Sequence, residues 1–234
     1  MKLSVIIPAY NEEKTVLKTL EEVVAVNLPI DKEIIIVNDG STDKTEQIIE
    51  NSIKKFPESN IKLLSKKNGG KGSALKEGIR KSTGELIIIQ DADLEYDPND
   101  YSKLIQPILE KEANVVYGSR LKNKENSYSH VSYLIGGIGV TLATNVLYGI
   151  FLTDEPTCYK VFNSDLKDIL INAEGDGFEW EPEITAKIIR KGHKIKEIPI
   201  NYYPRSKKEG KKIKWSDGVK AVETLLKWRF KKIN

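Results

Sequence analysis

A short apolar run that ends in acidic residues constrains the fold of this chain more than any other feature. Residues 86–89, Leu-Ile-Ile-Ile, are too few for a helix and rich in β-branched side chains, so they predict a strand buried on both faces. Asp91 and Asp93 follow, with Glu95 next in the series. Because alternate residues of extended backbone point to the same side, we expect these carboxylates to lie together. Such like charges need a cation between them, and carboxylate oxygens suit Mg²⁺ or Mn²⁺.

The same residues also fit a simpler interpretation, in which the strand runs into a solvated acidic turn and residues 97–98 start a helix. Two carboxylates two positions apart are common by chance. The rest of the chain has to decide between a cation site and a solvated turn.

Strands and helices alternate along the first half of the chain. Apolar runs predict strands at residues 3–7, 33–37, 61–64, 86–89 and 113–117, and helices are predicted between them, two of which are placed at 74–81 and 98–111. Strands that barely alternate in polarity predict an α/β domain with a mostly parallel sheet and helices on both faces. Ligands bind such sheets outside the carboxyl ends of the strands. The Tyr10-Asn11-Glu12 loop, Asp39, Lys71 and the Asp91/Asp93 pair all follow strand ends, so we expect a binding site there.

Two common phosphate-binding motifs are absent from these loops. The sequence Gly69-Gly-Lys-Gly-Ser has Gly72 where an ATPase phosphate loop needs Ser or Thr after Lys71. The turn after the first strand has no glycine, which excludes a dinucleotide fingerprint. Lys71 either meets a phosphate or base of a ligand, or is a solvated lysine in a capping loop.

Composition restricts the remaining classes of protein. Cys158 is the single cysteine of the 234 residues, which excludes an intrachain disulfide and fits a reducing compartment. We see no signal peptide and expect a cytoplasmic protein. Residues 204–234 hold 11 Lys and Arg against three Asp and Glu, whereas the whole chain has a net charge of only +3. This basic end favours phosphates of a substrate or of an anionic membrane, and not nucleic acid, because no nucleic-acid-binding motif accompanies it.

The second half of the chain is less regular. Residues 126–153 contain no Asp, Glu, Lys or Arg, and their four glycines favour one or two helices lying on the domain, with or without lipid contact, over a membrane span. A strand is predicted near 162, a helix over 178–190, and a strand or hairpin over 195–203. The last helix carries an apolar stripe predicted to pack against the core, with membrane-surface binding as the alternative: Trp215, Val219, Val222, Leu226 and Phe230.

Five motifs, in this order and spacing, resemble those of the family 2 inverting glycosyltransferases, in the branch of the dolichol-phosphate mannose synthases. They are Ser4-Val-Ile-Ile-Pro-Ala-Tyr-Asn-Glu12, Val37-Asn-Asp-Gly-Ser-Thr-Asp43, Asn68-Gly-Gly-Lys-Gly72, Asp91-Ala-Asp-Leu-Glu-Tyr-Asp-Pro98 and Gly118-Ser-Arg120. The resemblance implies a GT-A-type nucleotide-sugar-binding fold in residues 1–203, with a nucleotide-sugar half (1–120) and an acceptor half (121–203). Residues 204–234 would form a basic loop and an amphipathic helix.

The resemblance also implies roles for individual residues. Pro8, Ala9, Tyr10 and Glu12 would line the nucleotide pocket, and Asp39 would hold the base or ribose. Asp91 would face the nucleotide, while Asp93 and Glu95 would bind the metal, although the mannose synthases usually have Gln at the last position. Arg120 and Arg205 would handle the diphosphate and the acceptor phosphate, helped by Lys207, Lys208, Lys211 and Lys212. Residues 157–162 depart from the mannose branch, which leaves glucose or an N-acetylhexosamine open.

The chemistry of the acceptor remains a choice between two classes. A polyprenyl phosphate at a membrane surface is already an anion and needs no strong base, whereas a hydroxyl acceptor would need Asp154 or Glu181 as its base. Either way the donor is a GDP- or UDP-linked sugar, and one displacement inverts its configuration. We expect peripheral attachment to the cytoplasmic face of the membrane and allow for a membrane-protein partner. The rivals are a sugar-1-phosphate nucleotidyltransferase and a non-catalytic nucleotide-sugar-binding subunit.

Overall fold

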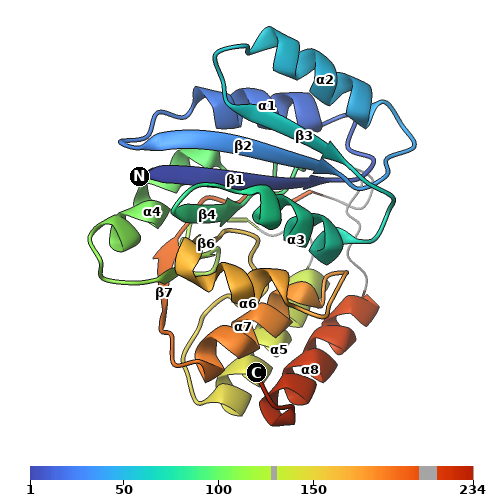
Figure 1. Cartoon of the computed structure of the whole chain (residues 1–234). Coiled ribbons are helices and arrows are strands. Elements are labelled where there is room, and N and C mark those ends of the chain that lie inside the picture. Colours follow the sequence, from blue (N-terminus) through green and yellow to red (C-terminus); the bar gives the residue numbers. More distant parts are fainter. Residues whose placement is uncertain (128–130, 206–214, 234) are drawn as a thin grey trace.

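A seven-stranded mixed sheet forms the centre of the molecule (Figure 1). The structure is a computed structural model, and it describes residues 1–127, 131–205 and 215–233. The strand order is β3-β2-β1-β4-β6-β5-β7. The strands are β1 (Lys2–Ala9), β2 (Asp31–Asn38), β3 (Ile61–Ser65), β4 (Leu86–Ile89), β5 (Val115–Ser119), β6 (Lys160–Asn163) and β7 (Ile195–Pro199).

The predicted mostly parallel α/β sheet is confirmed, with one strand reversed. β1 pairs in parallel with β2 and β4, β2 with β3, and β5 with β7, whereas β6 runs antiparallel to both β4 and β5. β4 has the bounds predicted from its apolar run, and all four of its side chains are buried. The sequence pattern could not predict the reversed direction of β6, because a buried strand has the same apolar pattern in either direction.

Helices cover the sheet on both sides. They are α1 (Val16–Ala25), α2 (Thr45–Lys55), α3 (Lys71–Lys81), α4 (Tyr101–Leu109), α5 (Val131–Tyr148), α6 (Lys167–Ile171), α7 (Trp180–Arg190) and α8 (Trp215–Phe230), with short 3₁₀ turns at Pro98–Asp100 and Ser164–Leu166. α3 packs on β1 and β2, and α4 packs on β5 and β6. Within the described residues, no helix combines the length and apolar character needed to cross a bilayer.

The first strand does not end at Ile7, as predicted, but continues through Pro8. β1 continues to Ala9, where the Asp39 N–H donates to the Ala9 carbonyl at 2.8 Å. β4 pairs with β1 only as far as Ile6 opposite Ile89. Pro8 therefore lies beyond the end of β4, where its missing N–H leaves no ladder bond unmade.

The prediction that the apolar stripe of the last helix packs against the core is wrong for most of its residues. Trp215 and Phe230 are each 80% exposed, and Val219 and Leu226 are exposed as well. α8 instead packs through Leu225 and Trp228, which form a second small core with Val140 of α5 and Ala186 of α7. α8 thus has two apolar faces, and contact with α5 and α7 buries only one of them. Figure 1 shows α5, α7 and α8 grouped at the end of the molecule away from α1 and α2.

Candidate active site

One cavity of about 1680 Å³ opens at the carboxyl ends of β1, β2 and β4 and extends between α5 and α8. Because the strands are parallel, the loops that follow them meet at this edge of the sheet. The sequence analysis gave thirteen of the described residues a role in catalysis, nucleotide binding or metal binding. All of them line this cavity: Pro8, Ala9, Tyr10, Glu12, Asp39, Lys71, Asp91, Asp93, Glu95, Arg120, Asp154, Glu181 and Arg205.

Asp39 shapes the glycine loop in front of α3. Its carboxylate accepts hydrogen bonds from the N–H groups of Gly69 and Gly70 at 3.0 and 2.8 Å, and its Oδ1 lies 2.8 Å from Lys66 Nζ. Gly70 has φ of +96°, and a Cβ there would come within 2.6 Å of the Asp176 carbonyl oxygen. The loop is thereby fixed so that α3 begins at Lys71, three residues earlier than predicted.

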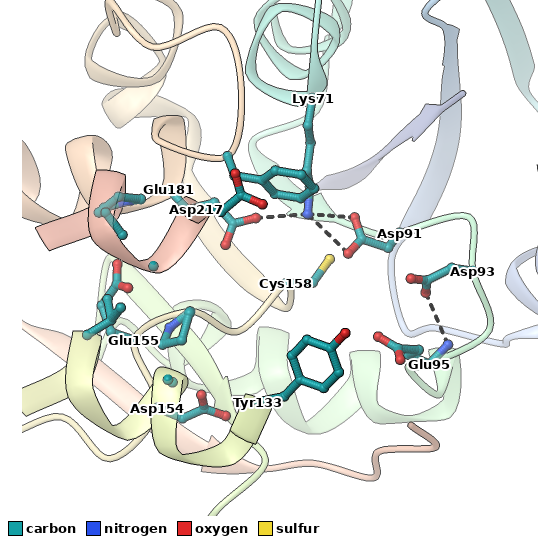
Figure 2. Close-up of a pocket in the computed structure, with 18 of the residues that line it drawn as sticks. Lys71, Asp91, Asp93, Glu95, Tyr133, Asp154, Glu155, Cys158, Glu181 and Asp217 are labelled. Atoms are coloured by element: carbon teal, nitrogen blue, oxygen red, sulfur yellow. Dashed lines mark hydrogen bonds and ion pairs between the residues drawn. The ribbon is translucent and has the colours of Figure 1, made fainter. Parts of the chain in front are cut away.

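Lys71 bridges two acidic side chains from different parts of the chain. Its Nζ lies 2.8 Å from Asp91 Oδ1 and 2.8 Å from Glu181 Oε1, as the dashed lines in Figure 2 mark. Burial lowers the pKa of Lys71, but the charges of Asp91 and Glu181 outweigh it and raise that pKa well above its usual value. Lys71 is therefore an ammonium ion fixed at the start of α3, beside the first acidic residue after β4.

Glu181 also forms an ion pair with a second lysine, Lys160, which the sequence analysis missed. Lys160 is 1% exposed, and its Nζ lies 3.2 Å from Glu181 Oε2. Burial raises the pKa of Glu181, yet Lys160 and Lys71 together hold it down at about 2. The available signal was a lysine inside an otherwise apolar strand, since a buried lysine needs an acidic partner.

Asp93 is held by Arg205, which comes from the other end of the chain. Arg205 Nη2 lies 2.8 Å from Asp93 Oδ2, and Nη1 lies 3.4 Å from Glu12 Oε2. The Arg205 N–H also donates to Glu95 Oε1 at 2.7 Å. The Glu95 N–H donates to Asp93 Oδ1 at 3.2 Å (Figure 2). Burial and the charges of Asp91 and Glu95 raise the pKa of Asp93 to about 7, although Arg205 opposes them.

Arg120 and Asp154 form a two-pronged ion pair in the wall of the cavity. The Arg120 Nε and Nη2 groups donate to the two oxygens of Asp154 at 2.8 and 2.7 Å, and the Arg120 backbone N–H adds a third bond at 2.8 Å. The guanidinium also lies over the Tyr202 ring, 5.1 Å from its centroid. Asp154 is thus already engaged, which makes it a poor acceptor for a substrate proton.

The acidic residues after β4 suit a divalent cation by their chemistry but are not gathered around one point. Carboxylate oxygens are the ligands that Mg²⁺ and Mn²⁺ prefer. Burial and, after it, the charges of Asp91 and Glu95 raise the pKa of Asp93, and a bound cation would neutralise those charges. In the part of the chain that the structure describes, no three His, Cys, Asp or Glu side chains come close enough to form a metal site. Lys71 and Arg205 occupy the oxygens of Asp91 and Asp93 instead. A metal role for Asp91, Asp93 and Glu95 stays a prediction.

The turn between Asp154 and Cys158 holds a second acidic side chain that the sequence analysis did not single out. Glu155 is fully buried, and neither of its carboxylate oxygens has a hydrogen-bond partner among the described residues. The buried hydroxyl of Thr157 is likewise without one. Burial raises the pKa of Glu155 and outweighs Lys160 and the nearby Thr185 side chain, which lower it. Glu181 and Asp154 add to the increase. The four helper lysines predicted at 207, 208, 211 and 212 lie outside the described residues.

Comparison with known proteins shows to which family the chain is similar. Residues 4–166 match the sequence profile of glycosyl transferase family 2. Dolichyl-phosphate beta-glucosyltransferase ALG5A of Trichomonas vaginalis is 33% identical over 96% of this chain and 72% of its own length. UDP-N-acetylglucosamine–dolichyl-phosphate N-acetylglucosaminyltransferase of Methanococcus voltae is 30% identical over 83% of this chain and 83% of its own length.

A solved structure supports the predicted GT-A fold. Glucosyl-3-phosphoglycerate synthase from Mycobacterium tuberculosis, crystallised with Mn²⁺, uridine diphosphate and glucosyl-3-phosphoglycerate, superposes with a TM-score of 0.71. The match covers 97% of this chain and 79% of that chain, at 18% sequence identity. At this identity the likeness concerns the fold, and the expected GT-A architecture is confirmed.

Proposed function

The chain belongs to glycosyl transferase family 2, and from this premise we propose that it is an inverting, metal-dependent enzyme that moves a hexose to a polyprenyl phosphate. The donor is a nucleotide sugar linked to UDP or GDP. Relatives named as dolichyl-phosphate glucosyl- and N-acetylglucosaminyltransferases support this acceptor class and leave the sugar open. Family membership speaks against the rival nucleotidyltransferase.

The ion pairs that Asp154 and Glu181 each form with basic residues favour a phosphate acceptor over a hydroxyl acceptor. A hydroxyl acceptor needs a carboxylate that can take its proton. Asp154 is bound by Arg120 on both oxygens, and Glu181 is bound by Lys71 and Lys160 with a pKa of about 2. Neither is suited to act as a base. A phosphate acceptor is already ionised at neutral pH, so its attack on the sugar needs no proton transfer.

The cationic residues supply the electrostatic part of the reaction. When the anomeric bond breaks, negative charge grows on the departing nucleoside diphosphate, and fixed cations stabilise it. Asp91, Asp93 and Glu95 would hold Mg²⁺ or Mn²⁺, which neutralises diphosphate charge when bound. Lys71, fixed at the start of α3, would meet the same diphosphate. Arg120 and Arg205 would handle the diphosphate and the acceptor phosphate.

The remaining roles concern the donor and the place of the reaction. Pro8, Ala9, Tyr10 and Glu12 would line the nucleotide pocket, with Asp39 at the base or ribose. We place the enzyme at the cytoplasmic face of a membrane, where its lipid acceptor is dissolved, as a peripheral protein with or without a membrane-protein partner. The basic charge of residues 204–234 supports this placement.

A donor and acceptor panel tests the proposal. The enzyme is incubated with UDP- and GDP-linked sugars and Mn²⁺, with a polyprenyl phosphate, the corresponding polyprenol or no acceptor, and nucleotide release is followed. We expect release of UDP or GDP to require the phosphate and the product to have inverted configuration. Equal transfer to the polyprenol, or retained configuration, would contradict the proposal. Release of pyrophosphate from a nucleoside triphosphate and a sugar phosphate would instead identify the protein as a nucleotidyltransferase.

A further inference from the structure

A buried carboxyl group without a partner lies in the wall of the cavity. Glu155 is fully buried and lines the cavity, and neither of its carboxylate oxygens has a hydrogen-bond partner among the described residues. Its backbone is fixed, because its N–H donates to the Thr141 hydroxyl of α5 at 3.0 Å. A buried polar group that makes no hydrogen bond lowers stability, so its presence in a binding cavity indicates a ligand that supplies the missing partner.

The ammonium groups near Glu155 are already paired with other carboxylates. Lys160 is the basic side chain whose charge acts on Glu155, and its Nζ lies 3.2 Å from Glu181 Oε2. Lys71 pairs with Asp91 and with the other oxygen of Glu181, at 2.8 Å each. Two ammonium groups therefore balance the two carboxylates of Asp91 and Glu181, and no cation of this cluster is left for Glu155.

The other polar groups that face Glu155 are engaged as well. The Thr185 hydroxyl has a single proton, which it donates to the Glu181 carbonyl at 3.0 Å. The Tyr117 hydroxyl is paired with Thr185 Oγ1 at 2.9 Å. Asp154 carries a negative charge of its own and is bound by an arginine. The partner that the Glu155 carboxyl lacks is therefore a hydrogen-bond donor from outside this cluster.

The turn that carries Glu155 connects the two phosphate positions of the proposed function, on which this step rests. At one end of the turn, Asp154 is bound by Arg120, one of the two arginines proposed for the acceptor phosphate. At the other end, the Cys158 thiol lies 3.8 Å from the carbonyl oxygen that ends β4, next to the proposed diphosphate site at Asp91. In Figure 2 Cys158 lies between Asp91 and Asp154.

A displacement in one step places the hexosyl group between the two phosphates. The attacking oxygen approaches the anomeric carbon from the side opposite the departing diphosphate, so the sugar ring lies between them. A ring held in this way lies over residues 154–158. Asp154 and Glu155 are the acidic residues of this turn, and Asp154 is bound by Arg120 on both oxygens. Glu155 is therefore the carboxyl group of the turn that can serve the sugar.

We propose that Glu155 binds the hexosyl group of the donor by accepting hydrogen bonds from its hydroxyl groups. A carboxyl group accepts such bonds whether or not it is protonated. No partner among the described residues holds the Glu155 carboxyl, so a change of rotamer can turn it toward the sugar. A sugar with a carboxylate of its own would bring like charges together beside Glu181 and Asp154. Glu155 thus selects an uncharged hexosyl group.

Calorimetric titration of the full chain separates contact with the sugar from contact with the nucleotide. The probes are UDP, GDP, UDP-glucose, UDP-N-acetylglucosamine, GDP-mannose and UDP-glucuronic acid, each with Mn²⁺ and without an acceptor. Glu155→Met keeps an unbranched side chain and removes both oxygens. We expect this variant to bind the preferred nucleotide sugar roughly tenfold more weakly than the parent protein does. Its affinity for the free nucleotide should be unchanged.

Glu155→Gln tests the hydrogen bond and the charge separately. The amide oxygen still accepts hydrogen bonds, so this variant should recover most of the affinity for the nucleotide sugar. It also removes a negative charge, so its discrimination against UDP-glucuronic acid relative to UDP-glucose should be smaller than that of the parent protein. A parent protein that binds UDP-glucuronic acid as tightly as UDP-glucose would contradict the proposal.

Thr157→Val is the matched control. The Thr157 hydroxyl lies in the same turn and is buried without a hydrogen-bond partner among the described residues, but Thr157 is not one of those that line the cavity. Thr157→Val should change neither the affinity for the nucleotide nor that for the nucleotide sugar. Glu155→Met should melt at no lower temperature than the parent protein, because it replaces an unpaired polar group with an apolar one.

The outcomes distinguish this inference from the function on which it rests. Equal weakening of nucleotide and nucleotide-sugar binding by Glu155→Met would show a structural role and overturn the inference. Sugar binding that Glu155→Met leaves intact, or that Thr157→Val weakens as much, would overturn it too and would leave the proposed function standing. A parent protein that binds none of the nucleotide sugars would contradict the proposed function and the inference together.

Discussion

Acidic side chains in the cavity are held by basic side chains that are distant in the sequence. Asp91 pairs with Lys71, Asp93 with Arg205, and Asp154 with Arg120. Ion pairs of this kind gain Coulomb energy but lose hydration, so they are weak contributors to stability as complete pairs and costly when one partner is removed. Their main effect here is to fix cations at defined points of the cavity, where the proposed phosphates arrive.

Glu181→Gln should make the protein less stable at neutral pH and remove part of its acid sensitivity. The folded-state pKa of about 2 lies below the usual 4.5, so the unfolded chain binds more protons between these values. The stability that Glu181 contributes is present above about pH 4.5 and lost as the pH falls toward 2. The variant leaves Lys71 and Lys160 without this partner, which should cost roughly 3–5 kcal/mol at pH 7. Urea unfolding at pH 3 and pH 7 measures both effects, and an undiminished loss of stability toward pH 3 would contradict the assignment.

Glu155→Gln should have the opposite pH dependence. Burial raises the folded-state pKa of Glu155, so the folded protein binds the extra proton. Its stability contribution is complete below pH 4.5 and is lost as the pH rises through the raised pKa. We expect the variant to match the parent protein near pH 4 and to be more stable at pH 8 by on the order of 1 kcal/mol. Urea unfolding at pH 4 and pH 8 measures this difference in stability. A variant less stable than the parent protein at pH 8 would contradict the prediction and show that Glu155 has an ionic partner.

At the scale of elements, the position of α3 determines where Lys71 lies. Gly78 lets this helix approach the sheet, because a Cβ there would lie 2.6 Å from Ile6 Cγ2 and 3.1 Å from Val37 Cγ2. The glycine loop fixes the helix start and Gly78 fixes its distance from β1 and β2. Together these contacts hold the Lys71 ammonium near Asp91.

Gly78→Ala should therefore destabilise the protein although alanine favours helices. Overpacking against β1 and β2 should cost about 1–3 kcal/mol, more than the propensity gain of about 1 kcal/mol. Gly218 in α8 is the matched control, because a Cβ there meets nothing within 4 Å. Gly218→Ala should be neutral or stabilising by about 0.5–1 kcal/mol. Thermal unfolding of both variants provides the comparison, and equal shifts in the two would contradict close packing at Gly78.

At the scale of the whole molecule, the site depends on contacts between the two ends of the chain. Glu12 and Asp93 come from the first half and Arg205 follows the last strand, yet the three side chains meet. The Tyr203 N–H donates to the Glu95 carbonyl at 2.8 Å, which ties this late segment to the acidic loop. Binding of a ligand at the acidic loop should therefore stabilise the fold as a whole.

Mn²⁺ with UDP or GDP should raise the melting temperature more than nucleotide alone. Ligand that binds only the folded state adds RT ln(1 + [L]/Kd), or about 2.7 kcal/mol at a hundredfold excess over Kd. Asp93→Ala should abolish the part that depends on Mn²⁺ and abolish sugar transfer, while Asp165→Ala, in the exposed turn before α6, should change neither. Differential scanning fluorimetry measures the shift. An unchanged Mn²⁺ effect in Asp93→Ala would make the metal role of Asp93 wrong.

Local sequence pattern was enough to predict much of the fold and to predict which residues line the cavity. The apolar run at β4, the alternation of strands and helices, and the polar residues after each strand are short-range properties, and parallel pairing necessarily brings those loops to one edge. For this reason all thirteen predicted site residues that the structure describes line the cavity. The metal and binding roles assigned to them stay predictions, because the pattern identifies which groups meet and not what they bind.

The tertiary structure alone decided how those residues are paired and which faces of the helices are buried. Lys160 and Glu155 were missed because they are buried by contacts with α7 and α5, which local pattern does not reveal. α8 has two apolar stripes of similar strength, and only its contact with α5 and α7 determines that Leu225 and Trp228 are buried while Trp215 and Phe230 are exposed. Periodicity measures how apolar a face is, whereas burial depends on what another element places against it, and that partner is chosen by the whole fold.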